Sequence, residues 1–242
     1  MKALQILSAY SLCILLLSAC SGDPVQGNGI LKEENRHLGP AAFSRIEIDA
    51  PVNTRITVGS PAALTLKGDA NLLRYVRSDI RNNTLHIYTD EHVDLNLRKN
   101  MSAIITLPAL TDFDASGAGS HDISGTIQSE EFNLELSGAS SLTISEMQVR
   151  SFGAALSGAT SLNLRSGTVG HGKYEVSGTG DIRAFGVTHQ VARIDLSGAA
   201  DAELTVTGTL EVEISGTGTV KYKGHPAVTQ DVSGIGSVTD AN

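Results

Sequence analysis

Four versions of one eleven-residue pattern decide the fold of this chain: LELSGASSLTI (134–144), AALSGATSLNL (154–164), YEVSGTGDIRA (174–184) and IDLSGAADAEL (194–204). Each version has a Ser-Gly pair near its centre, and apolar residues alternate with other residues on both sides. Further Ser-Gly pairs extend the series, so that its serines are residues 116, 137, 157, 177, 197, 215 and 233. The steps between them are 21, 20, 20, 20, 18 and 18 residues, which indicates an internal repeat.

Alignment on the serine separates inward from outward positions. The positions one and three residues before the serine are nearly always apolar, and the position between them is usually acidic. The positions five and seven residues after the serine are again mostly apolar. This alternation is typical of strands with one buried face. The two inward positions before the serine hold Phe113 and Ala115, Leu134 and Leu136, Ala154 and Leu156, Tyr174 and Val176, Ile194 and Leu196, Val212 and Ile214, and Gln230 and Val232.

A single repeat of this kind cannot bury its inward residues alone, so the repeats must stack. Stacking places equivalent strands about 4.8 Å apart, and glycine at each corner removes a Cβ that would clash there. The sequence therefore predicts an all-β protein whose residues 113–242 form a parallel β-helix (β solenoid) with coils of about 20 residues. A propeller is less suitable, because its blades need about 40 residues and seven repeats do not pair. A β-sandwich with recurring hairpins is the remaining alternative.

The pattern of residues 43–112 predicts a β-rich portion before the repeats. If this portion joins the solenoid, residues 43–242 form one continuous domain. Apolar residues alternate with polar ones from Ile46 to Val58, and the pattern resumes further on as far as Leu107. Arg81-Asn82-Asn83-Thr84 predicts a hairpin, since asparagine tolerates the positive φ angles of a tight turn. The stretch Asp69 to Tyr75 is the one place where a helical turn is expected.

The chain opens with Met1-Lys2, an apolar run from Ala3 to Leu17, and small residues before Cys20. These features form a secretory signal over residues 1–19, and the apolar run is shorter than the about 20 residues that span a bilayer. Leu17-Ser18-Ala19-Cys20 resembles the lipobox of bacterial lipoproteins. The resemblance implies cleavage before Cys20 and attachment of a diacylglyceryl group and palmitate-type chains to it. In Gram-negative lipoproteins, Asp directly after the lipidated cysteine often signals retention in the inner membrane. This chain has Ser21 at that position, which favours the outer membrane. An ordinary signal peptide with a chance cysteine is the alternative.

Residues 20–42 contain the lipidated cysteine and then polar residues without apolar periodicity, which predicts a flexible tether. Cys13 lies in the discarded leader, so no thiol remains for a disulfide. Loss of residues 1–19 leaves 223 residues and changes the formal charge from −8 to −9. An acidic chain is a poor partner for nucleic acid, and the membrane affinity must come from the lipid anchor.

Several motifs resemble the head GIN domain of putative auto-transporter adhesins. They are Phe43-Ser44-Arg45-Ile46, Ala50-Pro51-Val52, Gly68 to Leu73, Leu107-Pro108-Ala109-Leu110 and the Ser-Gly-Ala-Gly-like corners. The resemblance covers the chain from Phe43 to the C-terminus. It implies a β-helical envelope domain, often on a lipoprotein, with an adhesive role and no catalytic residues. Some corners depart from Ser-Gly-x-Gly at the fourth place, where Ser140, Thr160 and Ala200 stand.

Catalytic chemistry is not indicated, and no cofactor or metal centre is expected. The chain has no Trp and only five Tyr, so a sugar-stacking groove is difficult to assemble. The seven histidines, at positions 37, 86, 92, 121, 171, 189 and 225, show no metal-ligand spacing. His121 beside Asp122 is the one suggestive pair, but His121 falls in an inward column, which favours a core histidine. The serine column is explained by turn chemistry.

The acidic column is the best candidate for a functional surface. The outward position before the serine holds Asp114, Glu135, Ala155, Glu175, Asp195, Glu213 and Asp231. The last four would stack on successive coils, where exposed charges 4.8 Å apart repel by about 0.9 kcal/mol in water. Such a strip invites a divalent cation or a basic partner. The alternative interpretation is that the acidic column is an ordinary solvated face. Its charge would then be neutralised by Lys173 and Arg193, which lie two residues before Glu175 and Asp195. Asp181 above Asp201, just after the corners, is a second candidate for calcium.

These observations favour a non-catalytic cell-envelope lipoprotein that presents an adhesion or binding module for a protein or glycan ligand. A structural or assembly scaffold in the envelope is the alternative, and a glycan-active β-helix enzyme comes third. The sequence does not identify the ligand.

Overall fold

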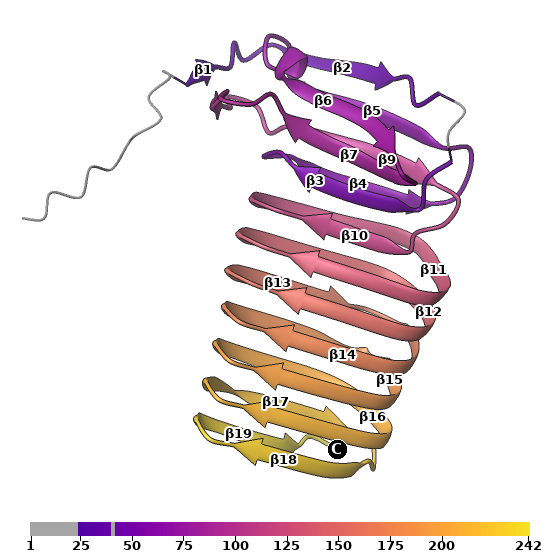
Figure 1. Ribbon diagram of the computed structural model, residues 1–242, viewed down its shortest axis with the longest axis vertical. Helices are drawn as coiled ribbons and strands as arrows, with labels where there is room; N and C mark the ends of the chain where they lie inside the picture. Colours follow the sequence, from indigo (N-terminus) through magenta and orange to yellow (C-terminus); the bar gives the residue numbers. More distant parts are fainter. Residues whose placement is uncertain (1–23, 40–41) are drawn as a thin grey trace, which may run out of the picture.

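The computed structural model describes residues 24–39 and 42–242, and it consists of strands wound into stacked coils (Figure 1). Strands make up 72% of the structure, with about six turns of a parallel β-solenoid. The predicted fold class is therefore confirmed. Cys20 and the leader lie outside the described residues. Within the described part of the chain, no helix is long and apolar enough to cross a membrane.

The coils stack in the register that the serine alignment predicts. Leu134 lies beside Ala154, Ala154 beside Tyr174, and Tyr174 beside Ile194, always in parallel strands. The strands of this portion are β10 (Asp112–Ala115), β11 (Ala118–Leu136), β12 (Ala139–Leu156), β13 (Ala159–Leu164), β14 (Gly167–Val176), β15 (Thr179–Leu196), β16 (Ala199–Ile214), β17 (Thr217–Lys223), β18 (Ala227–Val232) and β19 (Ile235–Asp240).

The corner glycines are required by the stacking. Gly138 and Gly158 have φ angles of +82°, a conformation that residues with a Cβ rarely adopt. A Cβ on Gly158 would also collide with the carbonyl oxygen of Gly138 in the neighbouring coil. The unequal repeat lengths are absorbed elsewhere, by register shifts between Ile123 and Thr126 and between Ala184 and Val191. The corners and the predicted inward columns therefore stay aligned while the return segments vary.

The inward columns form one continuous apolar core. Phe132 and Phe152 stack with ring centroids 5.6 Å apart, and Tyr174 meets Phe152 edge-on at 5.5 Å. Gly172 follows Phe152 in the same column. A Cβ there would press on the rings of His189 and Tyr174. Glycine at this point lets the aromatic ladder continue into a buried Tyr174–His189 pair, whose Oη and Nε2 atoms are 2.6 Å apart.

The N-terminal portion extends the stack and covers its upper end (Figure 1). In this portion β3 pairs in parallel with both β10 and β7, and β4 with both β11 and β9. One sheet therefore runs across residue 112 without a break. The elements are β1 (Val25–Gln26), β2 (Leu31–Arg36), β3 (Arg45–Asp49), β4 (Asn53–Val58), β5 (Ala63–Asp69), the 3-10 helix η1 (Leu73–Tyr75), β6 (Val76–Arg81), β7 (Thr84–Thr89), β8 (Leu95–Asn96) and β9 (Ser102–Leu107).

Two local predictions for this portion are confirmed. Strands β6 and β7 form an antiparallel hairpin, and Asn82 and Asn83 at its turn have φ angles of 49° and 67°. The expected helical turn is η1, which begins at Leu73, later than Asp69, where the expected stretch opens.

The prediction of a flexible tether throughout residues 20–42 is wrong for the segment from Val25 to Arg36. There β1 pairs with β8, and β2 pairs antiparallel with β5. The buried carboxylate of Asp69 accepts hydrogen bonds from the backbone N–H groups of Gly29, Arg98 and Lys99. These bonds satisfy a charge that would be costly to bury alone, and they attach the segment to the solenoid.

The last coil is more exposed than the predicted columns imply. Val228 and Val232 are each 37% exposed and Ile235 is 79% exposed. Inward positions are covered by the coils on both sides, and β18 and β19 have a neighbouring coil on one side within the described residues.

The coil register is tested by two adjacent substitutions. Leu196 is 1% exposed, so Leu196→Asp buries an unpaired charge and removes apolar burial, and we expect a loss of several kcal/mol of stability. Asp195 lies outward and pairs with Arg193 at the surface, so Asp195→Asn should cost less than about 1 kcal/mol. Urea unfolding of both variants gives the comparison. Equal losses would mean that the two positions are misassigned.

Candidate functional site

The predicted acidic column lies on one outward face of the solenoid, which we call the acidic face. It is formed by the outward side chains of β7, β3 and β10, of residues 131–136, 151–156, 171–176, 191–196 and 209–214, and of β18. Along it, Glu47, Asp114 and Glu135 occupy one column in direct register, and that column continues to Asp231. Regular stacking therefore extends the column upward to β3, beyond the repeats in which the sequence revealed it.

The four carboxylates predicted as a binding strip are brought into register, and three of them pair with bases. Lys173 Nζ lies 2.8 Å from Glu175. Arg193 lies 3.1 Å from Asp195 and 3.2 Å from Glu213, and it also contacts Glu211. Asp231 continues the column on the exposed last coil. In the lower half of the acidic face, formed by residues 171–176, 191–196 and 209–214 and by β18, most carboxylates therefore have a basic partner, although Arg193 is shared by three of them.

The second predicted pair, Asp181 and Asp201, also stacks directly. Asp181 forms an ion pair with Arg183 at 2.9 Å. Asp201 accepts a hydrogen bond from the backbone N–H of Thr219 at 2.8 Å. Each carboxylate therefore has its own protein partner at the corner.

The upper half of the acidic face, formed by β7, β3, β10 and residues 131–136 and 151–156, has fewer ion pairs between its carboxylates and basic side chains. Within the described part of the chain, no ion pair links Asp114 or Glu135 to a basic side chain. The nearby base Arg45 is directed to Asp112, at 3.2 Å. Partial burial, reinforced by the charges of Glu135, Glu47 and Asp49, raises the pKa of Asp114 to about 6. Uncompensated negative charge is therefore concentrated here.

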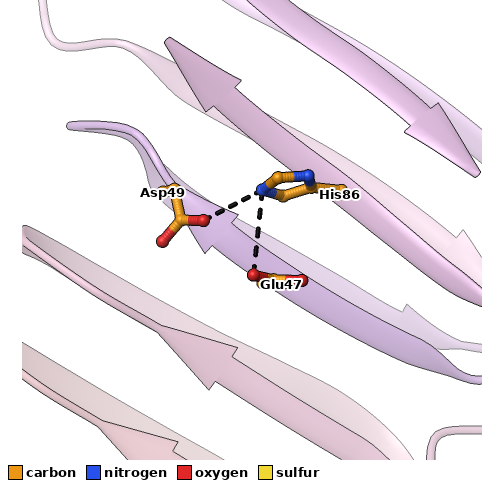
Figure 2. A group of neighbouring side chains, drawn as sticks. All are labelled: Glu47, Asp49 and His86. Atoms are coloured by element: carbon orange, nitrogen blue, oxygen red, sulfur yellow. Dashed lines mark hydrogen bonds and ion pairs between the residues drawn. The ribbon is translucent and has the colours of Figure 1, made fainter. Parts of the chain in front are cut away.

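Glu47, Asp49 and His86 form a compact group at the top of this half (Figure 2). His86 on β7 lies directly beside Glu47 on β3. Its Nε2 atom is 2.9 Å from Asp49 Oδ2 and 3.8 Å from Glu47 Oε1. Partial burial opposes ionisation of Asp49, but hydrogen bonds to Ser116 and His86 outweigh it and hold the pKa of Asp49 below its usual value.

A depression of about 470 Å³ lies directly below this group, lined by Asp114, Glu135 and Glu175 among others. Gly153 and Ala155 occupy its outward positions between those of Asn133 and Glu135 on one side and Lys173 and Glu175 on the other. Because Gly153 and Ala155 have almost no side chain, the sheet surface is left low between longer neighbours. The depression is therefore a consequence of small residues in one coil.

The histidines in the core serve packing. His121 is 4% exposed, its Nδ1 lies 2.9 Å from Thr54 Oγ1, and burial lowers its pKa to about 4. Asp122 points to the opposite, exposed side, so the suggestive pair is separated and the prediction of a core histidine is confirmed. Burial likewise lowers the pKa of His189 and raises that of Tyr174. Neither histidine reaches the surface.

Glu47, Asp49 and His86 were not predicted from the sequence, and Asp114 and Glu135 were not distinguished from the other residues of the acidic column. A signal was present for Glu47. Ile46-Glu47-Ile48 has the same alternation as Phe113-Asp114-Ala115, and the strands that contain them are paired. His86 carries no such signal, because β7 lies outside the repeats and joins the acidic face only through the pairing of β7 with β3.

Comparison with known proteins assigns this architecture to a family. Residues 42–226 match the model described as putative auto-transporter adhesin, head GIN domain. A putative adhesin from Bacteroides fragilis has the same fold, with a TM-score of 0.81 and 21% identity over 89% of this chain and 99% of that one. No match is found among the curated proteins.

Two further solved structures are similar. A putative adhesin from Parabacteroides merdae has a TM-score of 0.72 and 23% identity, over 91% of this chain and all of that one. A putative lipid binding protein from Parabacteroides distasonis has a TM-score of 0.73 and 20% identity, over 90% of this chain and all of that one. At these identities the likeness shows a shared fold.

The charge of the upper half is tested by Asp114→Asn. An acid whose pKa rises on folding destabilises the folded state above that pKa, and the effect disappears below the unfolded pKa, where both states are protonated. We therefore expect Asp114→Asn to raise the melting temperature near about pH 8 and to leave it unchanged near about pH 3.5. Glu213→Gln, which removes a carboxylate paired with Arg193, is the matched control and should show no such gain. An equal gain at both pH values would contradict the assignment.

Proposed function

This chain belongs to the head GIN domain family of putative auto-transporter adhesins, and on that premise we propose that it is a non-catalytic adhesion module of the bacterial cell envelope. Membership in this family associates it with the envelope or the cell surface. The module binds a basic segment of a protein ligand through the upper half of its acidic face. A lipid on Cys20 anchors the module in the membrane. Ser21 after the lipidated cysteine favours the outer membrane.

One observation carries this proposal. Carboxylates without a basic partner border a depression on the acidic face, whereas Glu175, Asp195 and Glu213 further along the same column each pair with Lys173 or Arg193. Asp114 and Glu135 line the depression together with Glu175, and of these Glu175 alone has a basic partner, Lys173. A lysine or arginine of a ligand would supply the missing charge at this place. It would also offset the neighbouring negative charges that, together with partial burial, raise the pKa of Asp114 to about 6.

The scaffold suits this form of binding. Ile46, Phe113 and Leu134 are buried directly beside the acidic column, so the strands that present the carboxylates are held by the core on their inner side. A preformed surface loses little conformational entropy when a ligand binds. Because the carboxylates lie in direct register, an extended basic segment can meet several of them at regular spacing.

Alternative functions have less support. A structural scaffold in the envelope would also bind through an outer face. However, no feature of the described residues indicates a second surface for an assembly partner. The third candidate, a glycan-active enzyme, would need reactive groups at the surface, and the buried Tyr174–His189 pair is enclosed in the core. One similar structure is a putative lipid binding protein. In this chain the interior is filled by apolar ladders, so an acyl chain is better accommodated as the covalent anchor on Cys20 than as a ligand inside the solenoid.

The anchor is tested by replacing Cys20. The thiol of Cys20 would accept the diacylglyceryl chain, so Cys20→Ala should abolish incorporation of labelled palmitate and leave the precursor poorly processed at that site. Cys13→Ala, in the leader, is the matched control and should be labelled like the wild type. Continued labelling of Cys20→Ala would disprove the lipoprotein assignment.

The binding site is tested with two double variants that remove equal charge at different places. The probe is a lysine decapeptide, measured by calorimetry with the full chain in detergent. Asp114→Asn with Glu135→Gln should weaken binding at least about tenfold, a change of about 1.4 kcal/mol in binding free energy. Glu211→Gln with Glu213→Gln changes the charge equally but removes carboxylates that lie outside the depression and pair with Arg193, so binding should change little.

Wild-type binding should also fall steeply between about 0.01 M and about 0.15 M ionic strength, over which the Debye length shortens from about 30 Å to about 8 Å. Equal loss in both double variants would show that net charge, and not the upper half of the acidic face, is responsible. Capture of envelope and host-matrix proteins by the wild type and by the two double variants then identifies the natural ligand.

A further inference from the structure

The group at the top of the acidic face has the side chains of a metal site in addition to its negative charge. Glu47 and Asp49 are two residues apart on β3 and point to the same side, and His86 stands beside Glu47 on the paired strand β7. One ligand atom from each lies within 4.8 Å of the others. Figure 2 shows the imidazole of His86 directed at both carboxylates.

The distances fit a small divalent cation. In a tetrahedral zinc site with bonds of about 2.1 Å, neighbouring ligand atoms are about 3.4 Å apart. His86 Nε2 is 2.9 Å from Asp49 Oδ2 and 3.8 Å from Glu47 Oε1. These two values lie on either side of the tetrahedral spacing, so modest side-chain rotations place all three atoms around one ion.

The surrounding contacts orient the three ligands. Ser116 Oγ donates a hydrogen bond to Asp49 Oδ1 at 2.6 Å, which leaves Oδ2 to face His86. The imidazole stacks on Tyr88 with centroids 4.5 Å apart. Tyr88 is itself fixed, because its hydroxyl donates to Asp79 at 3.1 Å. Such outer contacts hold metal ligands in place and set their affinity for the ion.

The negative charge of this group also favours a bound cation. Two carboxylates face one imidazole, and in the described part of the chain no Lys or Arg pairs with Glu47 or Asp49. Arg45, the base on the same strand, is directed to Asp112. A divalent cation would balance the charges of both carboxylates.

We propose that Glu47, Asp49 and His86 bind a transition-metal cation of the zinc class. Imidazole nitrogen suits zinc and its neighbours, and carboxylate oxygens complete the set. Calcium is a poor match, since it takes six to eight oxygen ligands, and this group offers a nitrogen and few oxygens. The three side chains are partly exposed, so water or a group of a bound ligand can occupy the remaining coordination position. This inference goes beyond the proposed adhesive function and does not depend on it.

The test is calorimetric titration of the full chain, purified in detergent, with Zn²⁺. The wild type should bind one ion at this site. His86→Gln and Glu47→Gln should each weaken binding by at least about 10- to 100-fold, the range already reached when only an outer partner of a ligand is lost. Two variants remove the same groups elsewhere on the acidic face: His171→Gln, from an exposed position, and Glu213→Gln. Both should bind like the wild type. All five proteins have the same cysteines, so a thiol cannot account for a difference between them.

Co²⁺ provides a second measurement. The wild type loaded with Co²⁺ should show the visible absorption of a low-coordinate site, and His86→Gln should lose it. Equal Zn²⁺ affinity in the wild type and His86→Gln, or no binding to the wild type, would overturn the proposal. Binding of the lysine decapeptide in the presence of a chelator separates the two ideas. If it persists while Zn²⁺ fails to bind, the metal site is disproved and the adhesive function stands.

Discussion

Parallel stacking of the coils in direct register is the constraint on which the rest of this structure depends. Each coil donates and accepts its backbone hydrogen bonds through its neighbours, so equivalent residues are placed directly above one another. On the inner side this gives continuous ladders of leucine, isoleucine and valine, which are favourable because apolar area is removed from water. On the outer side the same geometry places like charges in contact range. The apolar core and the acidic column thus have one cause.

The two halves of the acidic face show how stacked charges are accommodated. In the lower half Lys173 and Arg193 stand two residues before Glu175 and Asp195, and Arg193 reaches carboxylates on its own coil and the next. In the upper half the equivalent positions of β10 and the next two coils hold Asp112, Asn133 and Gly153, and Arg45 at this position on β3 pairs with Asp112, so Asp114 and Glu135 receive no base. Residues of one column therefore determine which carboxylates of the face have a basic partner.

Much of the fold could be predicted from the sequence, because the determining residues recur at a fixed interval. The inward columns and the glycine corners repeat at steps of 18 to 21 residues, and each repeat reports the same environment. Features that depend on a single long-range contact could not be predicted. Residues 25–36 are polar in sequence, and they are held by pairing with β5 and by the buried carboxylate of Asp69. His86 likewise joins the acidic face only because β7 pairs with β3. The sequence predicts an acidic strip from Glu175 to Asp231, and the carboxylates of the same column that lack a basic partner, Asp114 and Glu135, lie closer to the N-terminus.

This division between inner and outer columns has a consequence for how such a protein can acquire ligands. Inward residues are constrained from above and below, since a change of volume in one coil is felt by both neighbours. Outward residues lie on a solvated surface, where most substitutions change stability by only a few tenths of a kcal/mol. The outer face can therefore vary in charge and relief while the solenoid is preserved, as Gly153 and Ala155 create a depression without disturbing the strand that contains them. Solenoids that share this fold at low sequence identity can differ in what they bind, because recognition depends on a few outward columns and folding depends on the inward ones.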